Sequence, residues 1–407
     1  MKITSATIYP LSIPLMEPIK MSREIVADAK TVLLCISDEE GRQGWGEASV
    51  APLMTGETLD SLVGSVKYLV EQAKSWEWTE PKKFAEEFAK ILYGNASAKS
   101  CLEMALLDLF TQQQSISLWR YLRQENNLPD LETPAPIPLL RMLGGSFDKE
   151  VADAKSFREI GFRHWKIKIG SLSLAEDLQR VEALSNLLEG DVISVDANGA
   201  MSLSDAIQFC ESKEACKLSF AEQLVPADLP LEDFVILKKR SPIPIGLDES
   251  IHGLSEIDEF IKAKALDGAS LKLIKTGGVL PALEAGKTLL SQGLKMNLAC
   301  KIAETSLAGA ATASIGFALG EVPWGFSMSN QYLQFDICNQ PLKAQQGKLD
   351  VAQLSISGIG VIPNLDRVKS AIAKGYAAIE CWVHQTPPLI FWNKSLRPGQ
   401  FPRASIS

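Results

Sequence analysis

The chain has 407 residues, 46% of them apolar, which is enough for two domains and a sizeable core. Its formal net charge of −8 comes from charges dispersed along the chain, without the basic stripe that binding to a nucleic-acid backbone requires. Seven scattered cysteines without a CxxC pair argue against a disulfide framework and favour a reducing compartment.

The first residues, MKITSATIYPLSIPL, alternate like a strand. They contain neither the apolar core of a signal peptide nor a stretch long enough to span a membrane. We therefore expect a cytoplasmic protein with no membrane and no nucleic-acid partner.

Residues 1–130 predict an α+β capping domain. Residues 2–13 and 31–37 alternate as strands do, and the turn in DEEGRQGWGE leads into a third strand, so we expect an antiparallel meander. Helical spacing follows at about 57–75, 82–92 and 97–112. The proline-rich segment 126–138 is the expected crossing into the next domain.

Residues 131–330 alternate between short apolar runs and helical patterns, as repeated β/α units do. Strands are predicted at 138–143, 164–169, 191–196, 217–222, 243–248, 269–274, 294–299 and, more weakly, 322–327. Helices are predicted at 146–160, 173–188, 203–212, 229–240, 254–265, 279–292 and 304–318. Successive right-handed crossovers favour a modified (β/α)7β or (β/α)8 TIM-type barrel over an open doubly wound sheet, and no GxGxxG opens a helix.

The C-terminal part returns to short strands and turns. Residues 331–365, with GKLDV and SISGIGVIP, are expected to fold back on the cap and to complete it. The tail 366–407 has no place in this scheme.

Five polar residues recur at about the interval of one β/α unit: Lys168, Asp196, Glu222, Asp248 and Lys272. Each lies in or at the end of a short apolar run, so one group per strand would reach the same rim of a parallel barrel. Singly, each could be a helix cap or a turn residue, but the constant spacing makes the joint coincidence improbable. Three carboxylates offer the hard oxygen ligands of Mg²⁺, with Mn²⁺ as an alternative ion, and the two lysines flank them.

These groups suit the removal of a proton next to a carboxylate. The product is a dianionic enediolate, which a bound metal ion stabilises. The base must be neutral near working pH, and nearby positive charge favours a neutral amine. Lys166 shares a strand face with Lys168 and would assist it. Lys272 lies about four strands away, so a proton could leave one face of a carbon and return on the other.

At this constellation the chain resembles the enolase superfamily, and within it the muconate-lactonizing-enzyme subgroup. The resemblance runs from GWGEA through KIK, DAN, AEQ, LDES and LKLIKTGG to GIGV, nearly the whole chain apart from the tail. It implies a lyase or isomerase (racemase, epimerase, cycloisomerase or dehydratase) that forms a homo-oligomer and acts on a small carboxylate substrate.

The resemblance also assigns roles to residues. It implies that Asp196, Glu222 and Asp248 hold Mg²⁺. It makes Lys168 and Lys272 the acid/base pair, with Lys166 assisting. Two further residues, Asn198 and Glu249, are implied as auxiliary groups. The mandelate-racemase branch is disfavoured because it needs a histidine near the seventh strand, where none of the three histidines (His164, His252 and His384) occurs.

The segment 326–337, FSMSNQYLQFDI, bears on the reaction. Dipeptide epimerases typically carry Asp-x-Asp at the eighth strand, where this chain has Phe326 and Met328. The segment instead resembles the SxSxYxxxD pattern of the o-succinylbenzoate synthase and N-succinylamino acid racemase group. We therefore expect o-succinylbenzoate synthase-like dehydration or N-acylamino acid racemisation, with muconate cycloisomerase-type or dipeptide epimerase activity as alternatives.

Substrate contacts are less well marked. The candidates are Lys20, Arg23 and Met54 in the cap, Lys301 at the end of the seventh strand, and Ser327 and Ser329.

Two functional interpretations from other classes of protein stay open. Lys272 could form a Schiff base in a barrel aldolase, although clustered carboxylates would blunt its nucleophilicity. The chain could also be an inactive barrel that serves as a binding protein.

Overall fold

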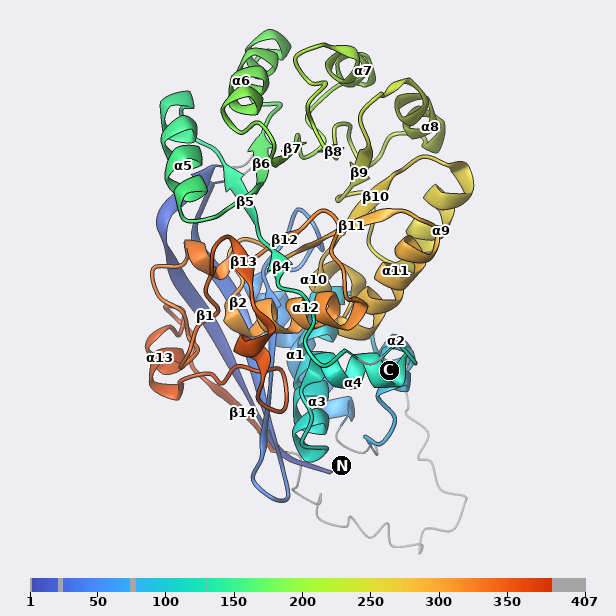
Figure 1. Cartoon of the computed structure of the whole chain (residues 1–407). Coiled ribbons are helices and arrows are strands. Elements are labelled where there is room, and N and C mark those ends of the chain that lie inside the picture. The colour runs from blue at the N-terminus through green and yellow to red at the C-terminus, as the bar shows by residue number, and fades with distance from the viewer. Residues whose placement is uncertain (1, 21–24, 74–77, 130, 383–407) are drawn as a thin grey trace, which may run out of the picture.

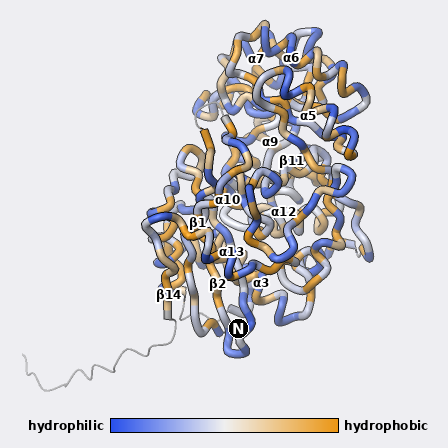
Figure 2. The backbone as a smooth tube through the Cα atoms, turned by 90° about the vertical axis from the view of Figure 1, so that its left-hand side faces the viewer, coloured by the Kyte–Doolittle hydropathy of each residue, from blue (hydrophilic) through white to orange (hydrophobic). Residues whose placement is uncertain are grey.

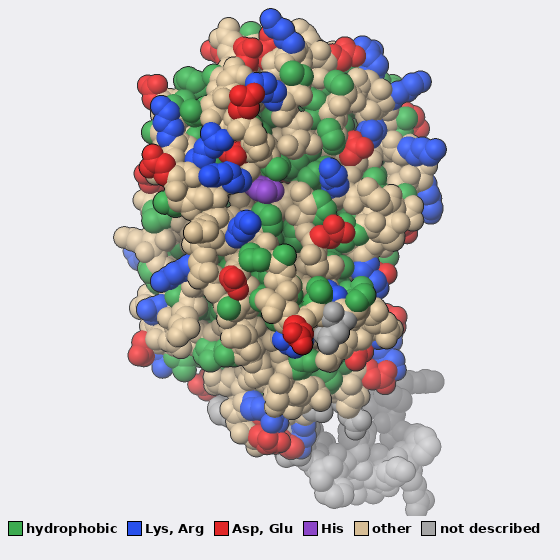
Figure 3. Space-filling view, viewed as in Figure 1, with side chains coloured by type: hydrophobic (Ala, Val, Ile, Leu, Met, Phe, Trp, Pro, Cys, Tyr) green, Lys and Arg blue, Asp and Glu red, His purple; other side chains and the backbone are tan. Residues whose placement is uncertain are grey.

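The computed structural model describes residues 2–20, 25–73, 78–129 and 131–382. Figure 1 shows a ring of helices around short strands above a long antiparallel sheet, and Figure 2 shows the same two parts from the side. None of the helices in these residues combines the length and apolarity that a membrane crossing needs. On the face shown in Figure 3, acidic and basic side chains are interspersed.

The upper part is an eight-stranded parallel sheet whose spatial order follows the chain from β5 to β12. The strands are β5 (Leu140–Leu143), β6 (His164–Lys168), β7 (Val192–Asp196), β8 (Phe220–Glu222), β9 (Ile245–Leu247), β10 (Gly268–Leu271), β11 (Lys295–Ala299) and β12 (Phe326–Ser327). A parallel bridge between Leu139 and Phe326 joins the first strand to the last. The sheet is therefore a nearly closed barrel.

A helix follows each of the first seven strands. These helices are α5 (Phe147–Glu159), α6 (Leu174–Leu187), α7 (Leu203–Glu211), α8 (Leu231–Arg240), α9 (Leu254–Ala263), α11 (Val279–Ser291) and α12 (Ser306–Leu319). The arrangement is (β/α)7β, which confirms the predicted fold class.

Strand β6 illustrates how sequence alternation builds the barrel. Trp165 and Ile167 are fully buried, while Lys166 and Lys168 alternate with them and line the central cavity. Below the cavity, Phe220 and Trp324 stack with ring centroids 4.1 Å apart. A Cβ at Gly246 would lie 2.8 Å from the Trp324 ring, so glycine on β9 makes room for this aromatic floor.

One predicted strand was too long. The apolar run 269–274 predicted a strand throughout, but β10 ends at Leu271 and a short helix, α10 (Leu273–Thr276), begins at once. The carbonyl of Lys272 accepts hydrogen bonds from the N–H groups of Lys275 and Thr276. The chain therefore turns at Lys272, and the two lysines three residues apart face the same region.

The lower part is the cap. Its sheet has the order β14-β1-β2-β3 and consists of β1 (Ile3–Lys20), β2 (Ile25–Asp38), β3 (Gln43–Ser49) and β14 (Ile379–Trp382). Its helices are α1 (Leu59–Ala73), η1 (Pro81–Lys83), α2 (Phe84–Ile91), α3 (Ala96–Gln113) and α4 (Leu118–Glu125). The glycines of GWGEA bring β3 against α3, because a Cβ at Gly46 would overlap the carbonyl of Cys101. No element was predicted where α4 lies.

The C-terminal segment runs along the cap and the base of the barrel. It contains η2 (Asn330–Tyr332), β13 (Lys348–Leu349), η3 (Val351–Leu354) and α13 (Leu365–Ser370), and β13 pairs with β4 (Ile137–Pro138). Of the tail that the sequence left without a place, residues 379–382 form β14 and pair antiparallel with β1.

Candidate active site

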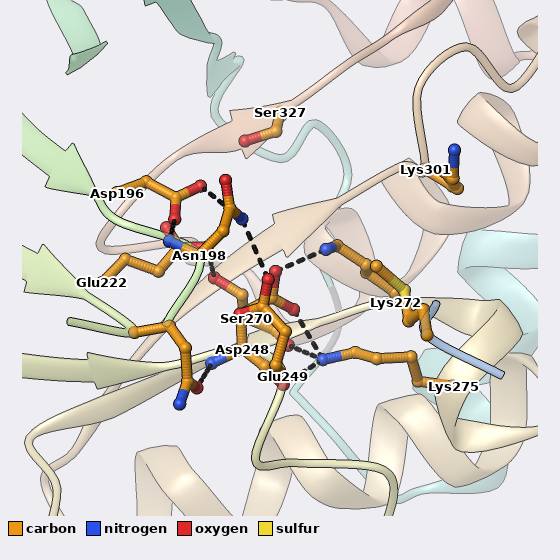
Figure 4. A network of polar contacts seen from close by, with 12 residues as sticks. Asp196, Asn198, Glu222, Asp248, Glu249, Ser270, Lys272, Lys275, Lys301 and Ser327 are labelled. Carbon is orange, nitrogen blue, oxygen red and sulfur yellow. Dashed lines mark hydrogen bonds and ion pairs between the residues drawn. The ribbon is translucent and has the colours of Figure 1, made fainter. Parts of the chain in front are cut away.

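The carboxyl ends of the parallel strands bring the five predicted residues to one rim. Lys168 and Asp196 end β6 and β7, Glu222 ends β8, and Asp248 and Lys272 directly follow β9 and β10. All but Glu222 line a cavity of about 420 Å³. Figure 4 shows the side chains of Asp196, Glu222, Asp248 and Lys272 converging.

Each carboxylate of this set has a lysine partner. Lys168 Nζ lies 2.6 Å from Asp196 Oδ2, and Lys272 Nζ lies 2.5 Å from Asp248 Oδ2. The Nζ of Lys166, the residue expected to assist Lys168, lies 2.5 Å from Glu222 Oε2. The rim is therefore a cluster of alternating charges.

Asp248 has a second lysine partner, which is not among the predicted site residues. Lys275 Nζ lies 2.6 Å from Asp248 Oδ1 and 2.5 Å from the carbonyl oxygen of Asp248. Its third contact is the carbonyl of Ser270 at 3.4 Å. Lys275 is only 3% exposed, so it is a fixed part of the site. Its spacing from Lys272 was the one signal in the sequence.

Two neighbouring polar residues extend the cluster. Asn198 Oδ1 accepts a hydrogen bond from Lys168 Nζ at 2.7 Å, and its Nδ2 donates to Glu249 Oε1 at 2.9 Å. This side chain therefore links Lys168 to Glu249. Asn198 has a φ of 46°, a left-handed conformation that asparagine adopts more readily than most residues.

Gln223 was not predicted. It is fully buried, and its Oε1 accepts the N–H groups of Asp248 and Ser250 at 2.9 and 3.1 Å. These bonds hold the backbone that carries Asp248. The sequence offered no signal beyond its place directly after Glu222.

Burial and ion pairing set the protonation of the carboxyl groups. Burial alone would raise the pKa of Asp248, but Lys272 and Lys275 lower it far below its usual range. Asp196 likewise has a lowered pKa because Lys168 and Lys166 outweigh its burial. Burial, together with the charges of Asp248 and Asp196, raises the pKa of Glu249 to about 7.

The two lysines at the cluster's centre respond in the opposite direction. Burial would lower the pKa of Lys272, but the nearby carboxylates, Asp248 first, raise it. The pKa of Lys166 is raised for the same reason, with Glu222 as the main partner. In this arrangement both amines are ammonium ions at neutral pH.

The donor set fits a hard divalent cation. Glu249 Oε2 is a buried carboxylate oxygen with no hydrogen-bond donor among the described residues, and Glu222 Oε2 has its ion pair with Lys166. Such oxygens favour a bound cation. As they stand, no three His, Cys, Asp or Glu side chains of the described residues are arranged to hold a metal ion, and lysines contact Asp196, Glu222 and Asp248.

Some candidate substrate contacts line the cavity, and the side chains of the others lie outside the described residues. Met54, Lys301, Ser327 and Ser329 line the cavity. Ser329 is committed to its own loop, since its Oγ donates to the carbonyl of Lys301 at 2.8 Å. Arg23 lies outside the described residues, and so does the side chain of Lys20.

The residues of the pattern Ser327, Ser329, Tyr332 and Asp336 do not all face the cavity. Tyr332 lines the cavity. Asp336 instead faces the start of α12, where its Oδ2 accepts the N–H and Oγ–H of Ser306 at 2.9 and 2.6 Å. Asp336 therefore has a structural role.

Comparison with known proteins extends over nearly the whole chain. Residues 149–367 match the family model described as enolase C-terminal domain-like. Residues 3–122 match the mandelate racemase / muconate lactonizing enzyme N-terminal domain.

The sequence identity to individual relatives is low. The chain is 28% identical over 286 residues to the L-Ala-D/L-Glu epimerase of Bacillus subtilis strain 168, covering 69% of this chain and 75% of that protein. It is 25% identical over 379 residues to the o-succinylbenzoate synthase of the same organism, covering 92% and 97%. The crystal structure of a dipeptide epimerase from Cytophaga hutchinsonii, complexed with Mg and the dipeptide D-Ala-L-Val, superimposes with a TM-score of 0.84 at 22% identity, covering 93% and 100%.

Proposed function

The chain belongs to the mandelate racemase / muconate lactonizing enzyme family of the enolase superfamily, and on this premise we propose a Mg²⁺-dependent enzyme that removes the proton α to a carboxylate. Lys168 and Lys272 are the proposed acid/base pair. The reaction is then o-succinylbenzoate synthase-like dehydration or racemisation of an N-acylamino acid.

The observation that carries this proposal is the position of the two lysines. Lys168 ends β6 and Lys272 directly follows β10, with three strands between them in the barrel, and both reach the same cavity. A substrate carbon between them would be approached from opposite faces. One lysine can therefore take the proton while the other holds or returns one.

The ion pairs leave both lysines room to act. Lys275 contacts one oxygen of Asp248 and Lys272 the other. Asp248 therefore keeps a counter-ion when Lys272 turns toward the substrate. Lys168 is 20% exposed at its side chain, more than its partner Asp196 at 3%, so it can also move while the carboxylate stays.

Asp196, Glu222 and Asp248 are the residues proposed to hold Mg²⁺. When bound, the ion would supply the positive charge that stabilises an enediolate. Lys166, which lines the cavity and pairs with Glu222, would orient that carboxylate.

The wall formed by β11 and β12 favours an acylated amino group over a free ammonium. Phe326 is fully buried and Met328 lines the cavity, so no carboxylate stands at these two positions. Lys301 also lines the cavity. A substrate ammonium would find no carboxylate at positions 326 and 328, which supports N-acylamino acids and o-succinylbenzoate precursors over dipeptides.

The test is α-proton exchange, followed by ¹H NMR in D₂O with Mg²⁺. The substrates are N-succinylamino acids, N-acylamino acids, dipeptides and the o-succinylbenzoate precursor. We expect deuterium uptake at the α-carbon, or loss of water from the precursor, and both should stop with a chelator. Exchange that survives replacement of both Lys168 and Lys272 by methionine would contradict the two-lysine mechanism.

The same enzyme preparation can be used to test the alternative that the protein is a Schiff-base aldolase. A Schiff-base lysine would be trapped by borohydride with a carbonyl substrate, whether or not chelator is present. We expect no such trapping at Lys272.

A further inference from the structure

One buried residue of the cap lies against the turn that follows Lys272. Glu103, in the middle of α3, is fully buried, and the N–H groups that donate to it belong to the barrel. We propose that Glu103 is a positioning residue for Lys272, so that the cap helps to fix where this lysine points. The inference rests on the proposed function, in which Lys272 is one of the two acid/base groups.

Strand pairing ends just before Lys272. β10 pairs with β9 at Gly268 and Ala269, and its pairing with β11 ends at Leu271. Lys272 directly follows this last paired residue. The position of its backbone therefore also depends on the turn that comes next.

That turn is held by hydrogen bonds across it. The N–H groups of Lys275 and Thr276 donate to the carbonyl of Lys272 at 3.0 and 3.1 Å. The Thr276 hydroxyl lies 3.2 Å from the carbonyl oxygen of Lys272 and 3.1 Å from that of Gly278, and it can donate to either. Thr276 therefore joins the residue before the turn to the residue after it.

Glu103 holds the far end of this turn. Its Oε2 accepts the N–H of Val279, the first residue of α11, and that of Leu280 at 3.4 Å. A Cβ at Gly278 would overlap the Glu103 carboxyl group, so glycine lets the chain approach α3 this closely. α3 also packs against α10, which Figure 1 shows where the barrel meets the cap. A continuous path of contacts thus leads from Glu103 to Lys272.

The turn matters because it carries two amines of the site. Lys272 Nζ lies 2.5 Å from one oxygen of Asp248, and Lys275 Nζ lies 2.6 Å from the other. Figure 4 shows both lysine side chains pointing toward Asp248. A shift of the turn would move both amines together, and a misplacement of about 1 Å lowers the rate of a reaction between positioned groups by about 10²-fold.

The alternative is that Glu103 only joins the cap to the barrel, and Asp108 provides the matched control. It lies on the same helix, is also buried, and accepts the N–H groups of Trp45 and Ile359 at 2.9 and 2.8 Å. Both partners lie outside the turn after Lys272. Glu103→Ala and Asp108→Ala each remove two backbone hydrogen bonds from α3, and we expect only Glu103→Ala to displace Lys272.

The first measurement needs no substrate. Reductive methylation of the full chain, followed by peptide mass spectrometry, gives the labelling rate of each lysine. Glu103→Ala should raise the rate at Lys272 relative to Lys168 by at least about threefold, because the turn then opens locally. Asp108→Ala should leave this ratio unchanged. Glu103→Gln, whose amide oxygen can still accept the N–H groups, should stay close to the wild type.

The second measurement is α-proton exchange in D₂O with Mg²⁺, on both enantiomers of an N-acylamino acid that the wild type exchanges. Lys272→Met identifies the enantiomer whose proton Lys272 removes. Glu103→Ala should slow the exchange of that enantiomer about tenfold more than the exchange of its mirror image. With the o-succinylbenzoate precursor, kcat should instead fall about tenfold with little change in KM.

A second variant keeps the test open if Glu103→Ala does not fold. Thr276→Val removes the hydroxyl that joins the two ends of the turn and keeps the shape of the side chain. It should change the labelling ratio and the exchange in the same direction as Glu103→Ala, and an unchanged labelling ratio would contradict the path from Glu103 to Lys272.

The outcomes are separable. An unchanged labelling ratio in Glu103→Ala overturns the inference, as does an equal change in Asp108→Ala. Equal slowing of both enantiomers also overturns it, because it reflects a general loss of structure. Absence of turnover by the wild type overturns the proposed function instead, and the labelling ratio still decides whether Glu103 fixes the position of Lys272.

Discussion

Buried carboxylates occur in two regions of this molecule, and they are neutralised in different ways. At the rim of the barrel, Asp196 and Asp248 contact lysine ammonium groups. Between cap and barrel, Glu47 and Glu103 accept backbone N–H groups at the starts of α12 and α11. The residue types and the degree of burial are nearly the same.

The difference lies in what the partner can do. A peptide N–H at a helix start is fixed, so it remains a permanent hydrogen-bond partner of the buried carboxyl group. A lysine can turn away, leaving its carboxylate for another cation and its amine for a proton. Buried acids at the interface therefore join the two parts of the fold, whereas those at the rim provide exchangeable charge.

The largest expected effect concerns the rim. Lys272→Met and Lys168→Met should each lower α-proton exchange, or catalytic turnover, by about 10²–10⁴-fold, because each removes a proton-transfer group. Thermal unfolding should show that both variants remain folded. For racemisation both losses should be severe, whereas elimination needs one lysine as base and the other only for its charge. If neither substitution lowered the rate of exchange, Lys168 and Lys272 would be structural residues and not the acid/base pair.

A substitution of Lys275 tests the distinction between fixed and mobile partners within the rim itself. Lys275→Met removes two hydrogen bonds to Asp248, and we expect the free energy of unfolding to fall by about 3 kcal/mol, as for a broken buried ion pair. Lys272→Met should cost less, because Asp248 keeps Lys275. Urea unfolding measures both, with Lys239→Met on the exposed side of α8 as control. If Lys272→Met lowered the free energy of unfolding more than Lys275→Met does, Lys272 would be the fixed partner of Asp248 and Lys275 the mobile one.

Glu103 tests the interface through pH. Burial raises its pKa to about 8, although the N–H groups of Val279 and Leu280 oppose this. Between about pH 4.5 and 8 the folded state keeps a proton that the unfolded state loses, so stability falls as pH rises, by at most about 1.4 kcal/mol per pH unit for one proton. Glu103→Gln should remove that part of the slope.

The measurement is urea unfolding at several pH values across this window. Glu304, whose pKa burial also raises to about 8, should leave a residual slope in the variant. An unchanged slope in Glu103→Gln would mean that Glu103 is ionised in the folded protein.

The smallest effect is local. His252→Ala removes one hydrogen bond, from Nε2 of an exposed side chain to the carbonyl of Met54, so global stability should change by less than about 0.5 kcal/mol. Hydrogen exchange at the amides of residues 53–55 should nevertheless become faster. Ser255→Ala, on the same exposed stretch, is the control. Equal protection in both variants would show that the hydrogen bond from His252 does not hold this segment of the cap.

The sequence predicted the barrel and its rim because both depend on spacing along the chain. One polar residue per β/α unit is visible without a structure, as is the alternation of Trp165 and Ile167 with Lys166 and Lys168. The domain divisions at 130, 330 and 365 stay a prediction, as do the roles of the rim residues.

What the sequence could not predict depends on contacts between distant segments. Lys275 was not among the predicted site residues, because the apolar run LKLI concealed the turn after Leu271. Glu103 lies within a helix and looked like any helical glutamate, yet its partner is 176 residues away. His252 and Met54 are 198 residues apart. Spacing carries no signal for such pairs.

The pairing of β14 with β1 bears on how the protein is made. Strand β1 precedes the barrel in the chain, but the cap sheet has the order β14-β1-β2-β3, so one edge of β1 is paired only when residues 379–382 emerge from the ribosome. The barrel, encoded between them, can form earlier. During translation the nascent chain therefore carries a nearly complete barrel beside an open strand edge, the feature most prone to wrong pairing.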